Sequence, residues 1–250
     1  MAKSRRATHK FTASDVATLD AKGYALVGVS PIDLPAFMTK YYNGFDLARW
    51  ISEIEGIMIP HALTPVDRII TVSKDSSLQV QFENQFTSED DALIFDRKFF
   101  REKGRLKVSH EYLVFPAPSR NKGHNKQVQL ASLQHYKAIG VKSIEVIAGL
   151  SAGAYVWARH GFVAVYREEM KQLLARAKKL LLPNQFKIVE RIYDAYYTKH
   201  PQGEEFPISR WADLPFMEKN VLKGPQSQWT GRLDLTNRMQ LRKFEEYVSS

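Results

Sequence analysis

Apolar and polar residues alternate in the middle of the chain with the period of two that is typical of a strand with one buried face. The clearest example is 78–84, and 68–73 precedes it across a short polar turn. The segments 92–100 and 105–115 repeat this arrangement around a second turn, and the last of them ends in residues that are apolar on both faces. The sequence therefore predicts two successive β-hairpins, with a central strand at the end of the second.

Apolar residues at helical spacing predict the helices of the chain. They are expected over 34–54, in two pieces interrupted at Asn43-Gly44, and over 124–139, 151–160, 167–182, 186–197 and 236–248. A capping box with proline at the first helical position, Ser30–Asp33, precedes the first of them.

Two further strands are predicted, over 142–148 and 229–235. The run from 105 to 148 thus reads strand, loop, helix, glycine, strand, which is a βαβ unit. We find no internal repeat. We expect a basic tail (1–10), an N-terminal helical region (11–66), a core (67–165) and a helical extension with a returning strand (166–250).

Composition narrows the class of protein. The 250 residues are 44% hydrophobic, as in a folded globular protein, and contain no cysteine. Disulfides, thiolate metal sites and a cysteine nucleophile are thereby excluded, and the histidines lack ligand spacing, so we expect no metal site. No apolar run approaches the roughly 20 residues of a membrane span, and no apolar segment follows the basic start. We expect a cytoplasmic protein without a membrane partner.

The net charge of +9, from 36 Lys and Arg against 27 Asp and Glu, bears on partners. Nucleic acid, an acidic protein or a polyphosphate cofactor would each be attracted. Lys171, Lys178 and Lys179 lie on the polar face of an amphipathic helix and are candidates for contact with nucleic acid. The alternative is a basic protein with no role in nucleic-acid binding.

The loop 119–126 is the main candidate site. It leaves a buried strand and opens a helix, where backbone N–H groups and the helix dipole favour an anion. Gly123 would let a phosphate approach the backbone closely, and the loop is basic. Its residues are Ser119, Arg120, Asn121, Lys122, Gly123, His124, Asn125 and Lys126. The alternative is an exposed basic turn with an ordinary helix start.

The pattern Arg120-x-x-Gly123-x-Asn125 resembles the pyrophosphate-binding loop of GNAT (Gcn5-related N-acetyltransferase) domains, which is usually Gln/Arg-x-x-Gly-x-Gly/Ala. In that family the loop joins the fourth strand to a long helix, and the fifth strand and a short helix follow. Here 142–148 matches the fifth strand, and 153–162 is similar to the closing helix with its terminal Gly-Phe. The resemblance covers 105–162, with a weaker match at 229–235, and is closest in character to GNAT-like domains of bacteriophage and mobile-element proteins.

The resemblance implies an α+β fold with a mixed, mostly antiparallel sheet, helices on both faces, and here extra C-terminal helices. It implies an acyl-CoA-dependent N-acyltransferase of phage or bacterial origin. The cofactor would be acetyl-CoA or another acyl-CoA, bound by the loop 119–126. The acceptor would bear an amine and could be a protein, a nucleobase or a small molecule.

The resemblance also implies catalytic residues. A carboxylate on the fourth strand usually deprotonates the amine, directly or through water, and Glu111 lies there. His110 is the other candidate, because it titrates near neutrality. Side chains alternate along a strand, so only one of the two can face the site. The family's general acid is often a tyrosine where Trp157 stands here, and Tyr155, two residues earlier, is the remaining candidate.

Two departures from the family pattern favour a second function. Asn125 replaces the small residue that lets the pyrophosphate sit deep in the loop, and Trp157 replaces the tyrosine. A non-catalytic, GNAT-derived protein that binds nucleic acid or joins an assembly would tolerate both. The intact Arg120 and Gly123 favour the acyltransferase.

Overall fold

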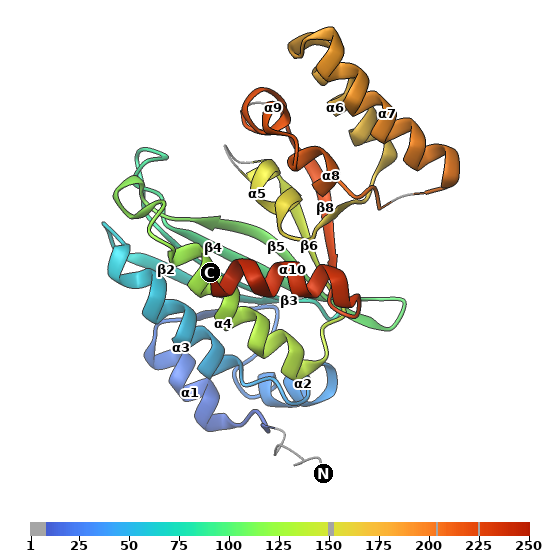
Figure 1. Ribbon diagram of the computed structural model, residues 1–250. Helices are drawn as coiled ribbons and strands as arrows, with labels where there is room; N and C mark the ends of the chain where they lie inside the picture. Colours follow the sequence, from blue (N-terminus) through green and yellow to red (C-terminus); the bar gives the residue numbers. More distant parts are fainter. Residues whose placement is uncertain (1–8, 150–152, 204, 225) are drawn as a thin grey trace. The chain divides into compact units, whose positions relative to one another are not determined.

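The structure is a computed structural model (Figure 1) that describes residues 9–149, 153–203, 205–224 and 226–250. The chain forms two compact units. Unit 1 runs to Lys142, and unit 2 runs from Ser143 to Val248. Most of the predicted basic tail, residues 1–8, and the first two residues of the predicted helix 151–160 lie outside the described residues.

Unit 1 contains a sheet in which the strands follow one another in chain order. The strands are β1 (Ala25–Val27), β2 (Val66–Val72), β3 (Leu78–Asn84), β4 (Ile94–Glu102) and β5 (Arg105–Val114). β1 pairs with β2 in parallel, and all the later pairs within this unit are antiparallel. The N-terminal end of β2 and the C-terminal end of β3 therefore lie at the same edge as the C-terminal end of β5.

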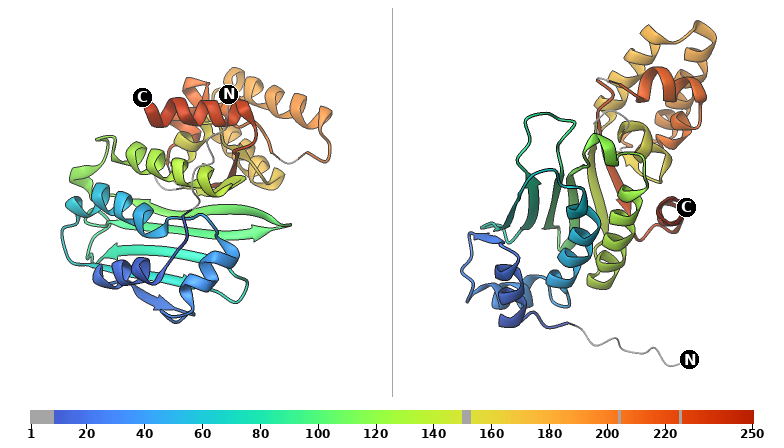
Figure 2. Two further views of the ribbon diagram at one scale, coloured as in Figure 1. Left: turned by 90° about the horizontal axis from the view of Figure 1, so that it is seen from below. Right: turned by 90° about the vertical axis from the view of Figure 1, so that its left-hand side faces the viewer.

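The helices of unit 1 come before β2 and after β5. They are α1 (Ala13–Ala21), α2 (Leu34–Tyr41), α3 (Leu47–Met58) and α4 (His124–Ile139), with short 3-10 turns η1 (Ile59–His61) and η2 (Ala117–Ser119). α3 and α4 lie side by side on one face of the sheet, as the right-hand view of Figure 2 shows.

An aromatic core holds these helices on the sheet. Trp50 of α3 lies 5.7 Å from Phe95 and 5.4 Å from Phe99 between ring centroids, and Tyr136 of α4 lies 5.7 Å from Phe99. All four side chains are buried. Because strand residues alternate between faces, the polar neighbours of these positions lie on the opposite face of the sheet. The apolar residues of these strands thus build the core beneath the helices, and their polar neighbours form the other face of the sheet.

Unit 2 has three strands, β6 (Ser143–Ala148), β7 (Val163–Ala164) and β8 (Trp229–Asp234), in the order β6-β8-β7 and all antiparallel. Its helices are α5 (Gly153–Arg159), α6 (Arg167–Leu180), α7 (Pro183–Lys199), α8 (Ser209–Ala212), α9 (Pro215–Met217), the π-helical turn η3 (Glu218–Leu222) and α10 (Arg238–Ser249). The buried Trp229 joins β8 to α5, because its indole N–H donates to Ala154 O at 3.2 Å.

The predicted fold class, α+β with a mostly antiparallel sheet flanked by helices and extra C-terminal helices, is confirmed. The interruption at Asn43-Gly44 separates α2 from α3, as expected. The predicted capping box with Pro31 at the first helical position is wrong: Asp33 N donates to Ser30 Oγ at 3.2 Å, but this contact closes a turn, and α2 begins at Leu34 with Asp33 as its N-cap. Among the described residues, no helix has the length and apolarity needed to span a bilayer.

Candidate functional site

The loop that follows β5 turns the chain into α4 through two residues with left-handed backbone. Asn121 has φ of 61° and Gly123, the N-cap of α4, has φ of 83°. The first N–H groups of this 16-residue helix have no intrahelical partner and carry the positive end of its dipole. A Cβ built on Gly123 would meet no atom within 4 Å, so the space beside the N-cap is open. The predicted anion site is thus geometrically accessible.

Arg120 braces this loop from within. Its Nε donates to Phe115 O at 2.9 Å, and Nη2 donates to Glu89 O at 2.7 Å. Nη1 lies 3.0 Å from Asp90 Oδ1, so the charge of the guanidinium is shared with a carboxylate. Arg120 holds the loop against the segment before β4, and Lys122 is the cation of the loop that extends into solvent.

His61, at the end of η1, is a residue of this site that sequence reasoning missed. Its Nδ1 lies 3.1 Å from Ser119 Oγ, and its ring lies 4.1 Å from that of His124 between centroids. Burial lowers the pKa of His61, and the charges of His124 and Lys122 lower it further. His61 and Ser119 are 58 positions apart in the sequence, a separation that gives no spacing signal, so only the fold reveals the contact.

The two candidate bases on β5 lie in different environments. His110 is 5% exposed, and its Nε2 lies 3.1 Å from Tyr136 Oη in the core beneath α4. Burial holds the pKa of His110 well below its ordinary value, with a further contribution from the charge of Arg97. Glu111 is partly exposed. A buried, neutral imidazole is poorly placed to meet a substrate, so Glu111 is the better placed of the two.

Glu111 stands at a β-bulge. Arg97 pairs with His110 and Asp96 pairs with Tyr112, so Glu111 is the extra residue of β5. Bulges are frequent next to active sites, where they redirect a side chain. Because of the register shift, Glu111 has no directly opposite residue on β4 and lies outside the regular pairing of the two strands.

Asp96 is a second carboxylate that sequence reasoning missed. It is 5% exposed, and Gln79 Nε2 donates to its two oxygens at 2.8 and 2.9 Å. Burial raises the pKa of Asp96, and the charge of Glu111 raises it further. A carboxyl with a raised pKa beside a more exposed one is a pattern found where acid and base roles are divided. The available sequence signal was an aspartate between Phe95 and Arg97 inside a predicted strand.

A hollow of about 390 Å³ opens along β1, β2 and β3, on the face of the unit 1 sheet to which Asp96 belongs. Asp67 and Glu83, which pair across β2 and β3, line it. Gln81 also lines it and pairs with Asp96 across β3 and β4. Carboxylates from neighbouring strands therefore share this face. Arg68 also lines the hollow, and its Nε is paired with Glu55 at 2.7 Å. The charge of the carboxylates would attract a cation although the chain as a whole is basic.

Tyr155, the third predicted catalytic residue, belongs to α5 in unit 2. Its Oη accepts a hydrogen bond from Arg159 Nη1 at 3.1 Å, and Lys223 Nζ lies 5.0 Å from its ring centroid. Burial and a hydrogen bond with Glu218 raise the pKa of Tyr155. The loop, His110 and Glu111 belong to unit 1, whereas Tyr155 belongs to unit 2.

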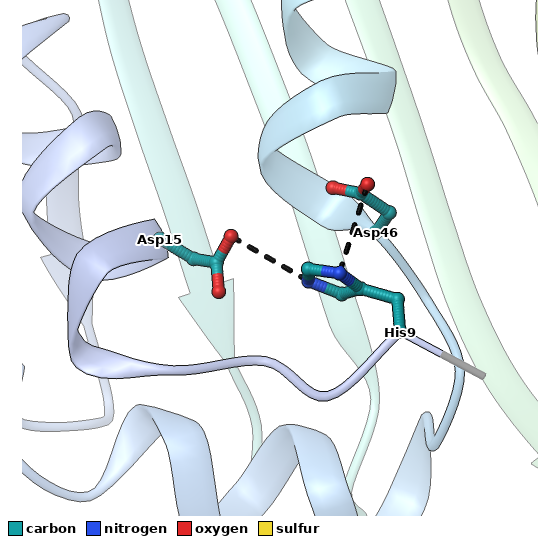
Figure 3. Close-up of side chains that lie close together, drawn as sticks. All are labelled: His9, Asp15 and Asp46. Carbon is teal, nitrogen blue, oxygen red and sulfur yellow. Dashed lines mark ion pairs between the residues drawn. The ribbon is translucent and has the colours of Figure 1, made fainter. Parts of the chain in front are cut away.

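A cluster of possible metal ligands lies away from the loop (Figure 3). Nε2 of His9 is 3.5 Å from Asp15 Oδ1, and its Nδ1 is 3.7 Å from Asp46 Oδ2. The other carboxylate oxygens cap helices: Asp15 Oδ2 accepts from Thr12 N, and Asp46 Oδ1 accepts from Arg49 N. Asp15 and Asp46 thus lie against different nitrogens of the His9 ring, each at the positive N-terminal end of a helix. This arrangement suits an imidazole that bridges two helix caps better than a metal ion shared by the three side chains.

Comparison with known protein families, with curated proteins and with solved structures finds no match to this chain.

Proposed function

We propose that the protein is an acyl-CoA-dependent N-acyltransferase of the GNAT kind, from a phage or a bacterial mobile element. The observation that carries this proposal is the connection from β5 to α4, in which Gly123 caps the helix with a left-handed backbone beside open space. β6 and α5 follow in the order that the resemblance requires. Acyl-CoA chemistry would place the protein in the cytoplasm of a bacterium or of a phage-infected cell.

The loop offers what the phosphates of acetyl-CoA, or of another acyl-CoA, need. The start of α4 supplies backbone N–H groups and a positive dipole end. Lys122 supplies an exposed positive charge, and Ser119 a hydroxyl. Arg120 contributes by holding the loop in shape rather than by pointing into the open space.

The reaction joins an amine to the acyl group. The amine nitrogen attacks the thioester carbonyl carbon and gives up a proton to Glu111, directly or through a water. The tetrahedral intermediate then collapses, the carbon–sulfur bond breaks, and the thiolate of CoA leaves with a proton. Tyr155, which the resemblance implies as a candidate donor of that proton, belongs to unit 2, and its raised pKa keeps it protonated.

The acceptor is proposed to be a cationic amine. Asp67 and Glu83 in the hollow, together with Glu111 and Asp96, would attract a protonated amine to this sheet face. At the point of attack, Glu111 would then accept the proton of the bound amine as a general base. Mono- and polyamines and lysine-containing peptides are therefore the first acceptors to test.

The test exploits the absence of cysteine. Each turnover releases one CoA thiol, and a chain with no cysteine adds no background to a thiol-reactive dye. Acetyl-CoA should also raise the midpoint of thermal unfolding, because a ligand that binds only the folded state stabilises it. Thiol release that requires both acetyl-CoA and an amine supports the proposal. The proposal is contradicted if acetyl-CoA does not raise the midpoint of thermal unfolding and no thiol is released.

A second function has its own support. Asn125 Oδ1, at the position of the small residue, accepts a hydrogen bond from Gln129 Nε2 at 3.2 Å, and Arg120 is committed to Asp90. Both features suit a non-catalytic, GNAT-derived protein that binds nucleic acid or joins an assembly through its basic surface. Retention of DNA or RNA at low salt, with no response to acetyl-CoA, would favour this function.

A further inference from the structure

Two histidines from distant parts of the chain meet at the start of α4. His61 ends η1, and His124 is the first residue of α4. Their ring centroids lie 4.1 Å apart with the planes inclined at 39°, and Phe115 lies against both rings. His61 also contacts Ser119 Oγ at 3.1 Å. The pair is therefore built into the loop that joins β5 to α4.

The charges that act on His61 are positive. Burial lowers the pKa of His61, and the charges of His124 and Lys122 lower it further. Arg120 of the same loop is paired with Asp90, and Ser119 is neutral. The start of α4 adds the positive end of the helix dipole. Without a ligand, this concentration of positive potential disfavours protonation of His61.

An anion reverses that balance. A dianion beside the two rings would accept hydrogen bonds from imidazolium N–H groups and would offset the repulsion between the cations. Protonation and anion binding would then strengthen each other, because each removes the cost that opposes the other.

We propose that His61 and His124, with Ser119 and the start of α4, form a proton-coupled site for a phosphate-type dianion. Binding of the anion draws a proton onto the histidine pair, so occupancy increases as the pH falls. The inference rests on the proposed function, in which the same loop takes the cofactor phosphates. It adds His61, from outside the resemblance, and a pH dependence to that site.

Inorganic sulfate is the probe, because its charge is constant between pH 5 and pH 8 and any change in affinity must come from the protein. Side-chain NMR of the full chain follows each histidine, and His61→Gln identifies the signal of His61. We expect the pKa of His61 to lie below its ordinary value without sulfate and to rise at saturating sulfate. Sulfate affinity should increase toward low pH by up to about tenfold per pH unit for one proton taken up. An unchanged His61 signal, or equal affinity at pH 5.5 and pH 8, would overturn the inference.

Glutamine variants separate the pair from other histidines. His61→Gln keeps a polar side chain that cannot titrate, and it should remove most of the pH dependence of sulfate binding. His200→Gln is the matched control, because the His200 ring lies against Tyr196 in unit 2, 4.7 Å away between centroids, and it should leave that dependence intact. Equal pH dependence in both variants would overturn the role of His61.

A parallel titration with acetyl-CoA keeps the two proposals distinguishable. Proton-coupled sulfate binding in a protein that does not bind acetyl-CoA supports the histidine site and contradicts the acyltransferase. Acetyl-CoA binding with pH-independent sulfate binding leaves the acyltransferase in place and overturns the histidine site.

Discussion

His110 and Glu111 are consecutive residues of β5, yet the first is buried against Tyr136 and the second is a partly exposed bulge residue. Simple strand alternation predicts that the two side chains diverge. The bulge and the helix α4 determine how: the imidazole belongs to the core of unit 1 and stays neutral, and the carboxylate remains accessible. This difference assigns the proposed role of base to Glu111.

Glu111→Gln should lower acyl transfer without weakening cofactor binding, because an amide cannot accept the proton of the amine. General-base catalysis contributes roughly 100- to 10,000-fold, and a loss in that range is expected in kcat. Thiol release at saturating acetyl-CoA measures it, with acetyl-CoA affinity determined on the same sample. Full turnover in this variant across the pH range would remove Glu111 from the mechanism.

Asp96→Asn should stabilise the protein at neutral and alkaline pH. The folded-state pKa of Asp96 is raised above its unfolded value, so the folded protein binds more protons in the window between the two values. The carboxylate therefore costs stability above the folded pKa, and this cost disappears as the pH falls to the unfolded pKa. An asparagine can still accept from Gln79 and carries no charge. Thermal melts at pH 8 and pH 4 should show a higher midpoint than the native chain only at pH 8. Equal midpoints of the variant and the native chain at both pH values would contradict a buried Asp96 carboxyl with a raised pKa.

Glu55→Ala should destabilise unit 1 strongly. Glu55 is 6% exposed and lies 2.7 Å from both Lys22 Nζ and Arg68 Nε, so it joins α3 to the end of α1 and to β2. Removing one partner of a buried ionic network costs about 3–5 kcal/mol. Urea unfolding measures this cost. Glu168→Ala breaks the exposed pair with Lys171 and is the control, with an expected change of less than about 1 kcal/mol. Similar losses in both variants would contradict a special role for the buried network.

The elements that the sequence predicted well are those with strong periodicity. Residues 78–84 and 124–139 match β3 and α4 in full, because their apolar positions face a core. α1 was missed because Leu19 is its only buried residue, so no apolar stripe exists to detect. β1 was missed because three residues are too few for an alternation to be recognised.

The candidate site was predictable only where its parts are local. The loop 119–126 and the alternation of His110 and Glu111 follow from neighbouring residues. Two other contacts depend on the sheet, which brings several loops to the same end of its strands. They are the pairing of Arg120 with Asp90, 30 residues away, and the contact of His61 with Ser119. Asp96 acquires its raised pKa only through burial and its neighbours across the strands.

A role in nucleic-acid binding makes a prediction about salt. Lys178 and Lys179 are exposed in the last turn of α6, whereas Lys171 is paired with Glu168 at 2.9 Å, so the first two are the better candidates for phosphate contacts. If they meet phosphates, reversing both to Glu should reduce the slope of log affinity against log salt by about two units. Gel-shift titrations at several salt concentrations measure the slope. An unchanged slope, or no retained complex at low salt, would leave these lysines without that role.

The central claim, that the loop 119–126 holds the cofactor phosphates, is tested most directly by calorimetric titration of CoA into Gly123→Asn and Gly140→Asn. The two glycines begin and end α4, both have positive φ, and both have open space around the missing Cβ. Asparagine tolerates this backbone, so the two variants carry a similar conformational cost. Only the first places a side chain where the phosphates would approach. We expect CoA affinity to fall by about tenfold or more in Gly123→Asn, roughly 1.4 kcal/mol, and to match the native chain in Gly140→Asn. Equal CoA affinity in the two variants would contradict the claim.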